Sequence, residues 1–386
     1  MILVVIIAFI SFIVMSLPGG MLGVAWPAMR DTFQVSLDAL GALLLTAAIG
    51  RTIMSFVSGQ LINRVGLGRV LLFGSLLLDI SLIGYVVAPS WQILNVSAFL
   101  SGIGGGMMVV GINAYFAKNH SPRLMNWLHA SFGVGITIGP VVMTVVLDAG
   151  GLWRWGYVVA LILQLIVTAS YILIRQGWRL GQSERATPDR IASSANALGL
   201  HTLKFPVVWL GMLLFFTTSG TEATVGSWAF SLLHEARGVP LKVAGLWVSV
   251  YWGSFTVSRV LFGLVINRLN LRQVLRVNMF IVGVGGLLIW LNFSSLVNFL
   301  GLILIGFALA PVFPLLVLKT PERVGQHHAE NAISYQIGSA SLGLALLPGI
   351  TGILANNISL EVVGPVIIVA ASMMIIVHET IIRRSQ

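Results

Sequence analysis

The 386-residue sequence contains no cysteine and very little charge. Without cysteine, the chain has no disulfide, no thiolate metal site and no thiol nucleophile. Charged residues make up only 9% of the chain, apolar residues make up 57%, and the mean hydropathy is +0.96. Soluble domains carry roughly 25% charged residues, so this composition is typical of a protein that crosses a membrane several times.

Common catalytic motifs are missing as well. The sequence has no His-Glu-x-x-His, no Gly-x-Ser-x-Gly and no Gly-x-x-x-x-Gly-Lys-[Ser/Thr], the motifs of zinc proteases, serine hydrolases and ATPases. His327 and His328 stand beside Glu330, but no further ligand is spaced to complete a metal site, so we interpret them as solvated. We expect neither an enzyme nor a primary pump, and neither a cofactor nor a metal.

Apolar runs of membrane-spanning length follow one another along the chain. A spanning helix needs about 20 apolar residues, and such runs cover 1–29, 38–61, 70–88, 92–117, 124–147, 155–174, 206–234, 241–266, 273–292, 296–318, 329–355 and 360–381. The first run has neither a basic segment before it nor a cleavage site, so we interpret it as a helix and not as a signal peptide. We predict an N-terminal bundle over 1–174, a polar cytoplasmic linker over 175–204 and a C-terminal bundle over 205–386.

Basic residues exceed acidic ones and give a formal net charge of +10. Most of the 22 Lys and Arg fall in the linker and in the loops on its side of the membrane. The loops on the other side carry Arg30, Arg154, Arg237 and Lys242. Because cytoplasmic loops are enriched in Lys and Arg, both termini are expected in the cytoplasm. The charge therefore reflects topology in a cell (inner, cytoplasmic) membrane, and it does not indicate nucleic-acid binding.

A short motif occurs once in each half. The first copy reads Gly59-Gln-Leu-Ile-Asn63-Arg64-Val-Gly66-Leu-Gly68-Arg69, and a degraded second copy reads Gly263-Leu-Val-Ile-Asn267-Arg268-Leu-Asn-Leu-Arg272. Each copy ends one apolar run and precedes another. The motif resembles the loop between helices 2 and 3 of the major facilitator superfamily, with Asn63 where that family usually carries Asp. The resemblance implies an all-α membrane fold of twelve transmembrane helices in two six-helix pseudo-symmetric bundles. It also implies structural or gating roles for Asn63, Arg64, Arg69, Asn267 and Arg268.

Several helical segments resemble the fucose-permease-like branch of that superfamily. They are Gly102–Gly106 with Gly111–Asn113, Asn126–Gly135, Gly220–Trp228 and Leu342–Pro348. Members of this branch are sugar:proton symporters, so the resemblance implies proton-coupled sugar transport. The branch often has carboxylates in helices 1 and 4, where this chain has Pro18, Gly19 and Gly20, and Val109.

Five ionisable residues stand out within the predicted membrane helices, namely Arg51, Asp79, His129, Glu222 and Arg259. A charge in hydrocarbon costs a few kcal/mol, so each must be paired, protonated or in contact with water. Arg51 and Asp79 lie roughly 18 and 15 Å from the same cytoplasmic turn, at 1.5 Å per residue, which predicts an ion pair between them. Arg259 lies near a helix end, where its side chain can extend to the interface or bond the terminal carbonyls, and we expect a gating or scaffold role.

Glu222 is the leading candidate for proton coupling. It is the only ionisable residue between Val207 and Leu233, and it stands near the middle of the bilayer in a segment rich in Gly and Thr. A carboxyl group without a partner on its own helix can exchange protons with one face of the membrane and then with the other. Asp79 and His129 are further candidates, and a permanently protonated structural acid is the alternative for Glu222.

Polar and aromatic side chains within the helices are candidates for substrate binding. Amides and imidazoles offer hydrogen bonds suited to hydroxyl groups, although they can equally bridge helices. Tryptophans offer flat surfaces that stack against the apolar face of a sugar ring. The predicted substrate-binding residues are Asn113, Asn126, His129, Glu222, Trp228, Trp252, Gln336 and Trp26.

These observations predict a secondary transporter that moves a small polar organic solute, a sugar or polyol, by alternating access coupled to protons. The expected partners are the small-molecule substrate, protons and the lipid bilayer, and we expect a monomer. An efflux protein or facilitator for drugs, lipids or glycolipids is the first alternative. A transport-inactive sensor or scaffold of the same fold is the second.

Overall fold

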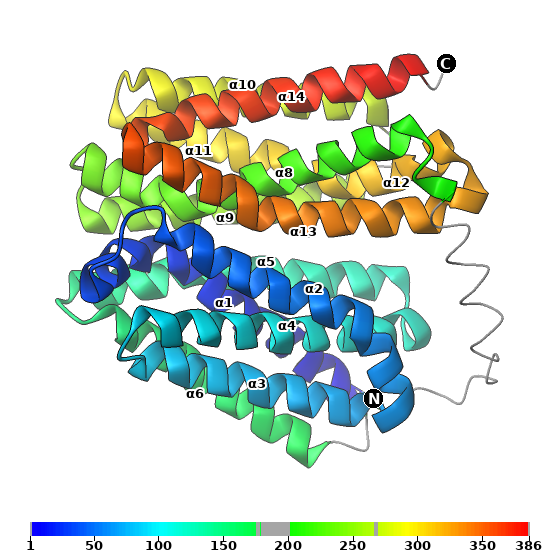
Figure 1. Cartoon of the computed structure of the whole chain (residues 1–386), viewed down its shortest axis with the longest axis horizontal. Helices are drawn as coiled ribbons and strands as arrows, with labels where there is room; N and C mark the ends of the chain where they lie inside the picture. Colours follow the sequence, from blue (N-terminus) through cyan, green and yellow to red (C-terminus); the bar gives the residue numbers. More distant parts are fainter. Residues whose placement is uncertain (1, 175–177, 179–200, 266–268, 385–386) are drawn as a thin grey trace.

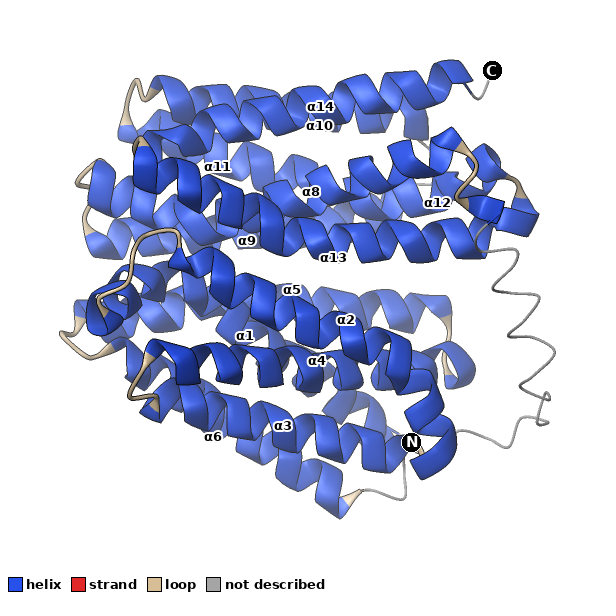
Figure 2. Ribbon diagram, viewed as in Figure 1, coloured by secondary structure: helices blue, strands red, loops and turns tan. Residues whose placement is uncertain are grey.

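The computed structural model describes residues 2–174, 178, 201–265 and 269–384, and these ranges form helices joined by short turns (Figure 1, Figure 2). The N-terminal half contains α1 (Ile2–Phe33), α2 (Ala39–Val65), α3 (Leu67–Val87), α4 (Trp91–Asn119), α5 (Pro122–Asp148) and α6 (Trp153–Leu173). The C-terminal half contains α8 (Pro206–Ser231), η2 (Leu232–Ala236), α9 (Leu241–Val265), α10 (Leu271–Leu291), α11 (Ser295–Leu309), α12 (Val312–Val324), α13 (Gln326–Asn357), η4 (Leu360–Val362) and α14 (Val363–Arg384). The predicted all-α membrane fold is confirmed.

Eleven helical segments of the described chain are long and apolar enough to cross a membrane. The segment α8 is not among them, because its central Thr, Ser and Gly residues and Glu222 lower its hydropathy. One predicted span is interrupted: α11 ends at Leu309 and α12 begins at Val312, with Pro311 between them. A proline lacks the backbone N–H that would continue the helical ladder, which explains the break.

The two halves repeat the same packing scheme and appear as adjacent bundles in Figure 1. In the first half, α1 packs on α5 and α6, α4 packs on α2 and α3, and α3 packs on α6. In the second half the matching pairs are α8 with α13 and α14, α11 with α9 and α10, and α10 with α14. Across the boundary α2 contacts α13, α5 contacts α9, and α1 contacts α8. This pseudo-symmetry places α1, α2, α5, α8, α9 and α13 around the boundary between the bundles.

Glycines allow the closest of these approaches. A Cβ on Gly20 of α1 would meet the carbonyl oxygen of Ile136 on α5, and a Cβ on Gly343 of α13 would meet that of Phe216 on α8. Small residues let membrane helices pack by van der Waals contact where no hydrophobic force draws them together. Glycine thus allows close packing of α1 on α5 in the first half and of α8 on α13, the equivalent pair, in the second half.

The turn that carries the first copy of the repeated motif is a single residue long. Gly66, with φ of 88°, separates α2 from α3, and only glycine adopts such a conformation without strain. Asn63, Arg64 and Arg69 are solvent-exposed beside it. Asn267 and Arg268 of the second copy lie outside the described residues, as does most of the predicted linker.

Contacts between the halves are concentrated toward the end where α1 finishes and α2 begins. Ion pairs join Arg30 to Glu235 (2.8 Å) and Lys242 to Asp148 (3.9 Å) there. Close by, a Cβ on Gly41 of α2 would lie 2.8 Å from the Cα of Gly349 on α13. We call this region the closed end.

The contacts between α5 and α9 extend from the closed end to about the middle of the molecule. The Ser249 hydroxyl donates to the Thr137 carbonyl (2.6 Å), and the Thr137 and Thr256 hydroxyls lie 3.3 Å apart. Beyond this point, toward the end that carries the chain termini, Arg51, Asn126 and His129 are exposed. Solvent therefore reaches the inner helices from the end with the termini.

Candidate functional site

Glu222 lies near the middle of α8 and is partly accessible to solvent. Its backbone carbonyl accepts a hydrogen bond from the hydroxyl group of Tyr251 on α9 (3.1 Å), and Tyr251 is fully buried. The Glu222 carboxylate interacts electrostatically with Arg259 and Tyr251. These contacts join α8 to α9 at a carboxyl group that solvent can reach.

Arg259 supplies the positive charge of this site. Its guanidinium carbon lies 4.4 Å from the centre of the Phe255 ring, a cation–π contact. Phe255 precedes Arg259 by one turn, so the side chain extends along α9 toward Glu222 and away from the helix end. The expectation that Arg259 reaches the interface is therefore wrong. Its Nε is buried and has no hydrogen-bond partner.

His129 of α5 approaches the same charge from the N-terminal half. It interacts electrostatically with Arg259, and its ring makes an edge contact with Phe12 of α1, with centroids 5.7 Å apart. His129 and Asn126, one turn earlier, are both exposed. Glu222, Tyr251, Phe255, Arg259 and His129 form a cluster that bridges the two halves, and we call it the central cluster.

The predicted ion pair between Arg51 and Asp79 is not formed. Arg51 is solvent-exposed on α2, whereas Asp79 is buried on α3 beside Thr168 of α6. Neither Asp79 carboxylate oxygen has a hydrogen bond of good geometry, while Thr168 bonds Ser75 (2.6 Å). The prediction combined equal depth with the assumption that consecutive helices are neighbours, but α2 and α3 both pack chiefly on α4 and contact each other little. Asp79 therefore lies within the N-terminal bundle, apart from the central cluster.

Three of the predicted substrate ligands are buried in helix contacts. The Trp228 indole donates to the Pro348 carbonyl (2.9 Å) and covers Gly352, so it fills the closed end. Gln336 accepts a hydrogen bond from Thr320 (2.8 Å). Trp26 packs on Trp91 of α4 with ring centroids 5.8 Å apart.

Two further predicted ligands lie on α9 and α4. Trp252 is 5% exposed, covers Gly226 of α8 and has an indole N–H without a partner. Asn113 on α4 is partly accessible, and its side-chain oxygen is buried without a partner. Trp252 and Asn113 thus each keep an unpaired polar atom, as does the buried Trp26, whose indole N–H has no partner either.

The role of Phe255 was not predicted from the sequence, although a signal was present. Tyr251, Phe255 and Arg259 recur every four residues, and residues at this spacing share one helix face. An aromatic pair followed by a membrane arginine on one face favours a cation–π contact. The position of Glu222 opposite that face depends on the packing of α8 on α9, which no local pattern reveals.

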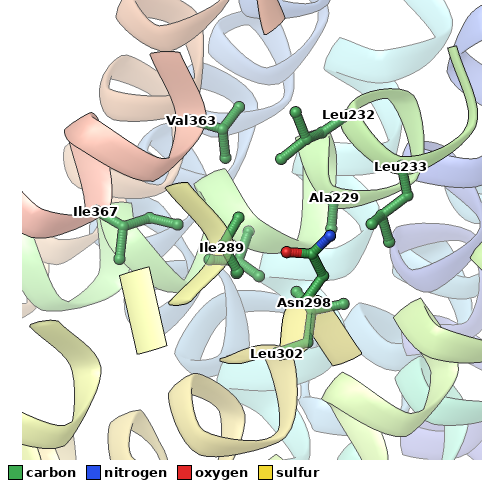
Figure 3. A pocket seen from close by; sticks show the side chains of 9 residues that line it. Ala229, Leu232, Leu233, Ile289, Asn298, Leu302, Val363 and Ile367 are labelled. Atoms are coloured by element: carbon green, nitrogen blue, oxygen red, sulfur yellow. The ribbon is translucent and has the colours of Figure 1, made fainter. Parts of the chain in front are cut away.

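One cavity of the C-terminal half can be set aside as a solute site because of its size. A cavity of about 10 Å³ lies in the C-terminal half near the end of α8 and is drawn in Figure 3. It is lined mainly by aliphatic side chains, with Asn298 as its polar member. A volume of roughly 10–15 Å³ holds a single water, so the cavity is too small for an organic solute. Among the described residues, no three His, Asp or Glu side chains converge to hold a metal ion.

Comparison with known proteins identifies the family. The model of the major facilitator superfamily matches residues 5–348. The chain belongs to this superfamily. Its members are carriers, so membership agrees with the lack of enzyme motifs in the sequence.

Curated relatives and solved structures extend this comparison. The chain is 26% identical to an uncharacterized transporter of Sinorhizobium fredii, over 75% of this chain and 74% of that protein. It is 22% identical to the glucose/mannose transporter GlcP of Bacillus subtilis, over 84% of this chain and 81% of that protein. The structure of a D-xylose-proton symporter matches with a TM-score of 0.78 at 14% identity, covering 97% of both chains. That of the nucleoside transporter NupG matches with a TM-score of 0.79 at 14% identity, covering 98% of both.

Proposed function

We propose that this member of the major facilitator superfamily is a proton-coupled secondary transporter of a small polar organic solute, a sugar or polyol. The observation that carries the proposal is Glu222, a partly exposed acidic residue near the middle of α8 that interacts with Arg259. We also propose that the chain acts in the cytoplasmic membrane with both termini in the cytoplasm. The end with the termini is then the open, cytoplasmic side.

The substrate class is supported by the site and by the relatives. Asn113, Asn126 and His129 have solvent access and combine hydrogen-bond donors and acceptors, which suit hydroxyl groups. Trp252 offers an unpaired indole N–H and a flat surface. The named relatives transport glucose and mannose, xylose or nucleosides, all of which carry a polyhydroxylated ring.

In the proposed cycle, Glu222 alternates between a deprotonated form that interacts with Arg259 and a protonated form. As a carboxylate it interacts with Arg259, and this interaction makes both charges tolerable inside the membrane. Protonation removes the negative charge and frees the Arg259 guanidinium to donate hydrogen bonds to a solute hydroxyl. The halves then rock about the central cluster, and Glu222 and the solute become accessible from the opposite side. Coupling arises because solute and deprotonated Glu222 compete for Arg259.

The test replaces Glu222 by glutamine, which keeps the shape but cannot carry a proton. In proteoliposomes with an imposed pH gradient, Glu222→Gln is expected to abolish uphill accumulation while solute exchange remains measurable. Accumulation by the unmodified protein is expected to fall as the outside pH rises, and exchange by the variant to be independent of pH. The matched control is Glu330→Gln, at an exposed carboxylate of α13, which should accumulate solute normally.

Uphill uptake by Glu222→Gln at the normal rate would remove Glu222 from the coupling mechanism. A panel of sugars, polyols and nucleosides in counterflow identifies the substrate. Counterflow of lipophilic drugs or glycolipids alone would favour the efflux alternative. Movement of none of these solutes would favour a sensor or scaffold.

A further inference from the structure

A cavity of about 210 Å³ lies inside the C-terminal half, away from the central cluster. It is enclosed by the first turn of α10 and the last turns of α12 and α14, which meet at the end of the molecule that carries the C-terminus (Figure 1). A single water needs roughly 10–15 Å³. The cavity is thus large enough for a polyatomic ligand.

The polar lining of this cavity is mainly cationic. Arg272 comes from α10, and Lys319 and Arg323 come from α12. The only carboxylate in the lining is Glu322, whose oxygens accept hydrogen bonds from Lys319 (2.7 and 2.9 Å). Arg323 is attracted by Glu322 and repelled by Arg272, so this single carboxylate faces three cationic side chains of the lining. An anion between the two guanidinium groups would relieve this repulsion.

His378 of α14 adds a hydrogen-bond donor to the same cavity. It is 1% exposed, and its Nδ1 lies 3.5 Å from Nη2 of Arg323. Because a guanidinium only donates, Nδ1 must accept, which places the proton of the neutral ring on Nε2. This Nε2 is buried and has no hydrogen-bond partner. A buried donor without an acceptor costs about 1–3 kcal/mol, and an anionic oxygen would satisfy it.

We propose that this cavity binds the phosphate group of an anionic phospholipid. Phosphate matches the lining because its oxygens accept from several arginine N–H groups and from His378 at once. A lipid is favoured over free phosphate because Leu275, Ile381 and Ile382 complete the lining with apolar surface. In addition, Val277 of α10 and Ile376 of α14 are exposed next to this region, where acyl chains would lie. Basic pockets between membrane helices at the bilayer surface are known to suit such head groups.

The proposal is independent of the proposed transport function and predicts lipid selectivity. Native mass spectrometry of the detergent-solubilised full chain would compare phosphatidylglycerol with phosphatidylcholine of the same acyl chains. We expect the first phosphatidylglycerol to bind more tightly than phosphatidylcholine. Arg272→Gln, at an exposed side chain in the first turn of α10, should weaken phosphatidylglycerol binding about fivefold, the loss expected for one basic contact.

His378→Ala should weaken phosphatidylglycerol binding as well, whereas Arg384→Gln is the matched control. Arg384 is exposed at the same end but does not line the cavity, so its replacement should leave binding within about twofold. Equal binding of the two lipids, or equal loss in Arg272→Gln and Arg384→Gln, would overturn the proposal. A third arm with sodium phosphate alone distinguishes the source. Saturable phosphate binding that depends on Arg272, without preference for phosphatidylglycerol, would overturn the lipid assignment.

Discussion

At the scale of single residues, the charges of Glu222 and Arg259 depend on each other. Both lie partly accessible on adjacent helices, and they interact without a direct ion pair among the described residues. Removing one charge leaves the other without its counterpart in a region of low dielectric. The loss of both charges should therefore destabilise the protein by less than the sum of the two single losses.

A double-mutant cycle tests this dependence. Arg259→Gln and Glu222→Gln should each lower the melting temperature, and the double variant should lie above the additive expectation by about 0.5–3 kcal/mol of coupling energy. Tryptophan fluorescence during thermal unfolding in detergent provides the measurement. Tyr251→Phe, which removes one hydroxyl group and no charge, is the control and should show little coupling with Arg259→Gln. Additive effects of the two charge replacements would show that the charges do not interact.

The same residues show what the sequence could predict of the site. Glu222 was predictable because it is the only ionisable group on its helix. The direction of the Arg259 side chain was not, because the contact with Phe255 competes with extension toward the interface. Arg51 and Asp79 illustrate the opposite error, since sequence spacing gives depth along a helix but not the neighbour that each helix face meets. The sequence could thus identify the ionisable residues within the helices, but not the neighbours that their side chains meet.

At the scale of elements, glycine positions decide how closely helices pack. Gly19 and Gly20 are adjacent on α1, but a Cβ on Gly19 meets no atom within 4 Å, whereas one on Gly20 meets the Ile136 backbone of α5. Periodicity and length were enough to place both residues on one helix. Only the packing of α1 on α5 distinguishes their roles.

Gly19 and Gly20 offer a matched pair of substitutions. Gly20→Ala should force α1 and α5 apart and destabilise the protein by about 1–3 kcal/mol. Gly19→Ala should be neutral or stabilise by up to about 1 kcal/mol, because alanine favours the helix over glycine. Thermal unfolding in the same detergent compares the two. Equal destabilisation would mean that helix propensity and not interhelical contact governs this segment.

The elements themselves were largely predictable. The apolar runs fixed the number and order of spanning helices, because hydrocarbon admits no unsatisfied backbone. The break between α11 and α12 was not predicted, because the run from 296 to 318 is almost entirely apolar and reads as one continuous span. A membrane helix can keep a proline when neighbours satisfy the freed carbonyls, so the sequence alone does not decide between a kink and a break.

At the scale of the whole molecule, the structure holds one state of an alternating cycle. The closed end is joined by backbone contact between Gly41 and Gly349 and by two ion pairs, whereas Asn126 near the other end is exposed. In an alternating mechanism these accessibilities exchange when the halves rock. Weakening the closed end should therefore shift the population toward the opposite state.

Gly41→Leu places a bulky side chain where α2 meets α13 and should open the closed end. Because the chain has no cysteine, an Asn126→Cys variant reports accessibility at the other end without interference. We expect its rate of labelling by a soluble maleimide to fall severalfold when Gly41→Leu is added. Gly19→Leu, at a position without neighbours, is the control and should leave the rate unchanged. If the Gly41→Leu variant still unfolds cooperatively but its labelling rate is unchanged, the contact between α2 and α13 does not control the conformational equilibrium.

The proposed role of Glu222 beside Arg259 has a consequence for how the membrane potential acts on the protein. Whatever the other charges contribute, the deprotonated and protonated forms of the central cluster differ by one elementary charge. Moving one charge through a membrane potential of 100 mV is worth about 2.3 kcal/mol. In the proposed proton-coupled cycle, a voltage that is negative inside therefore favours inward movement of the protonated form over the deprotonated form by this amount. Substrate accumulation would respond to voltage even where no pH difference exists, and Glu222→Gln would lose this response together with the pH response.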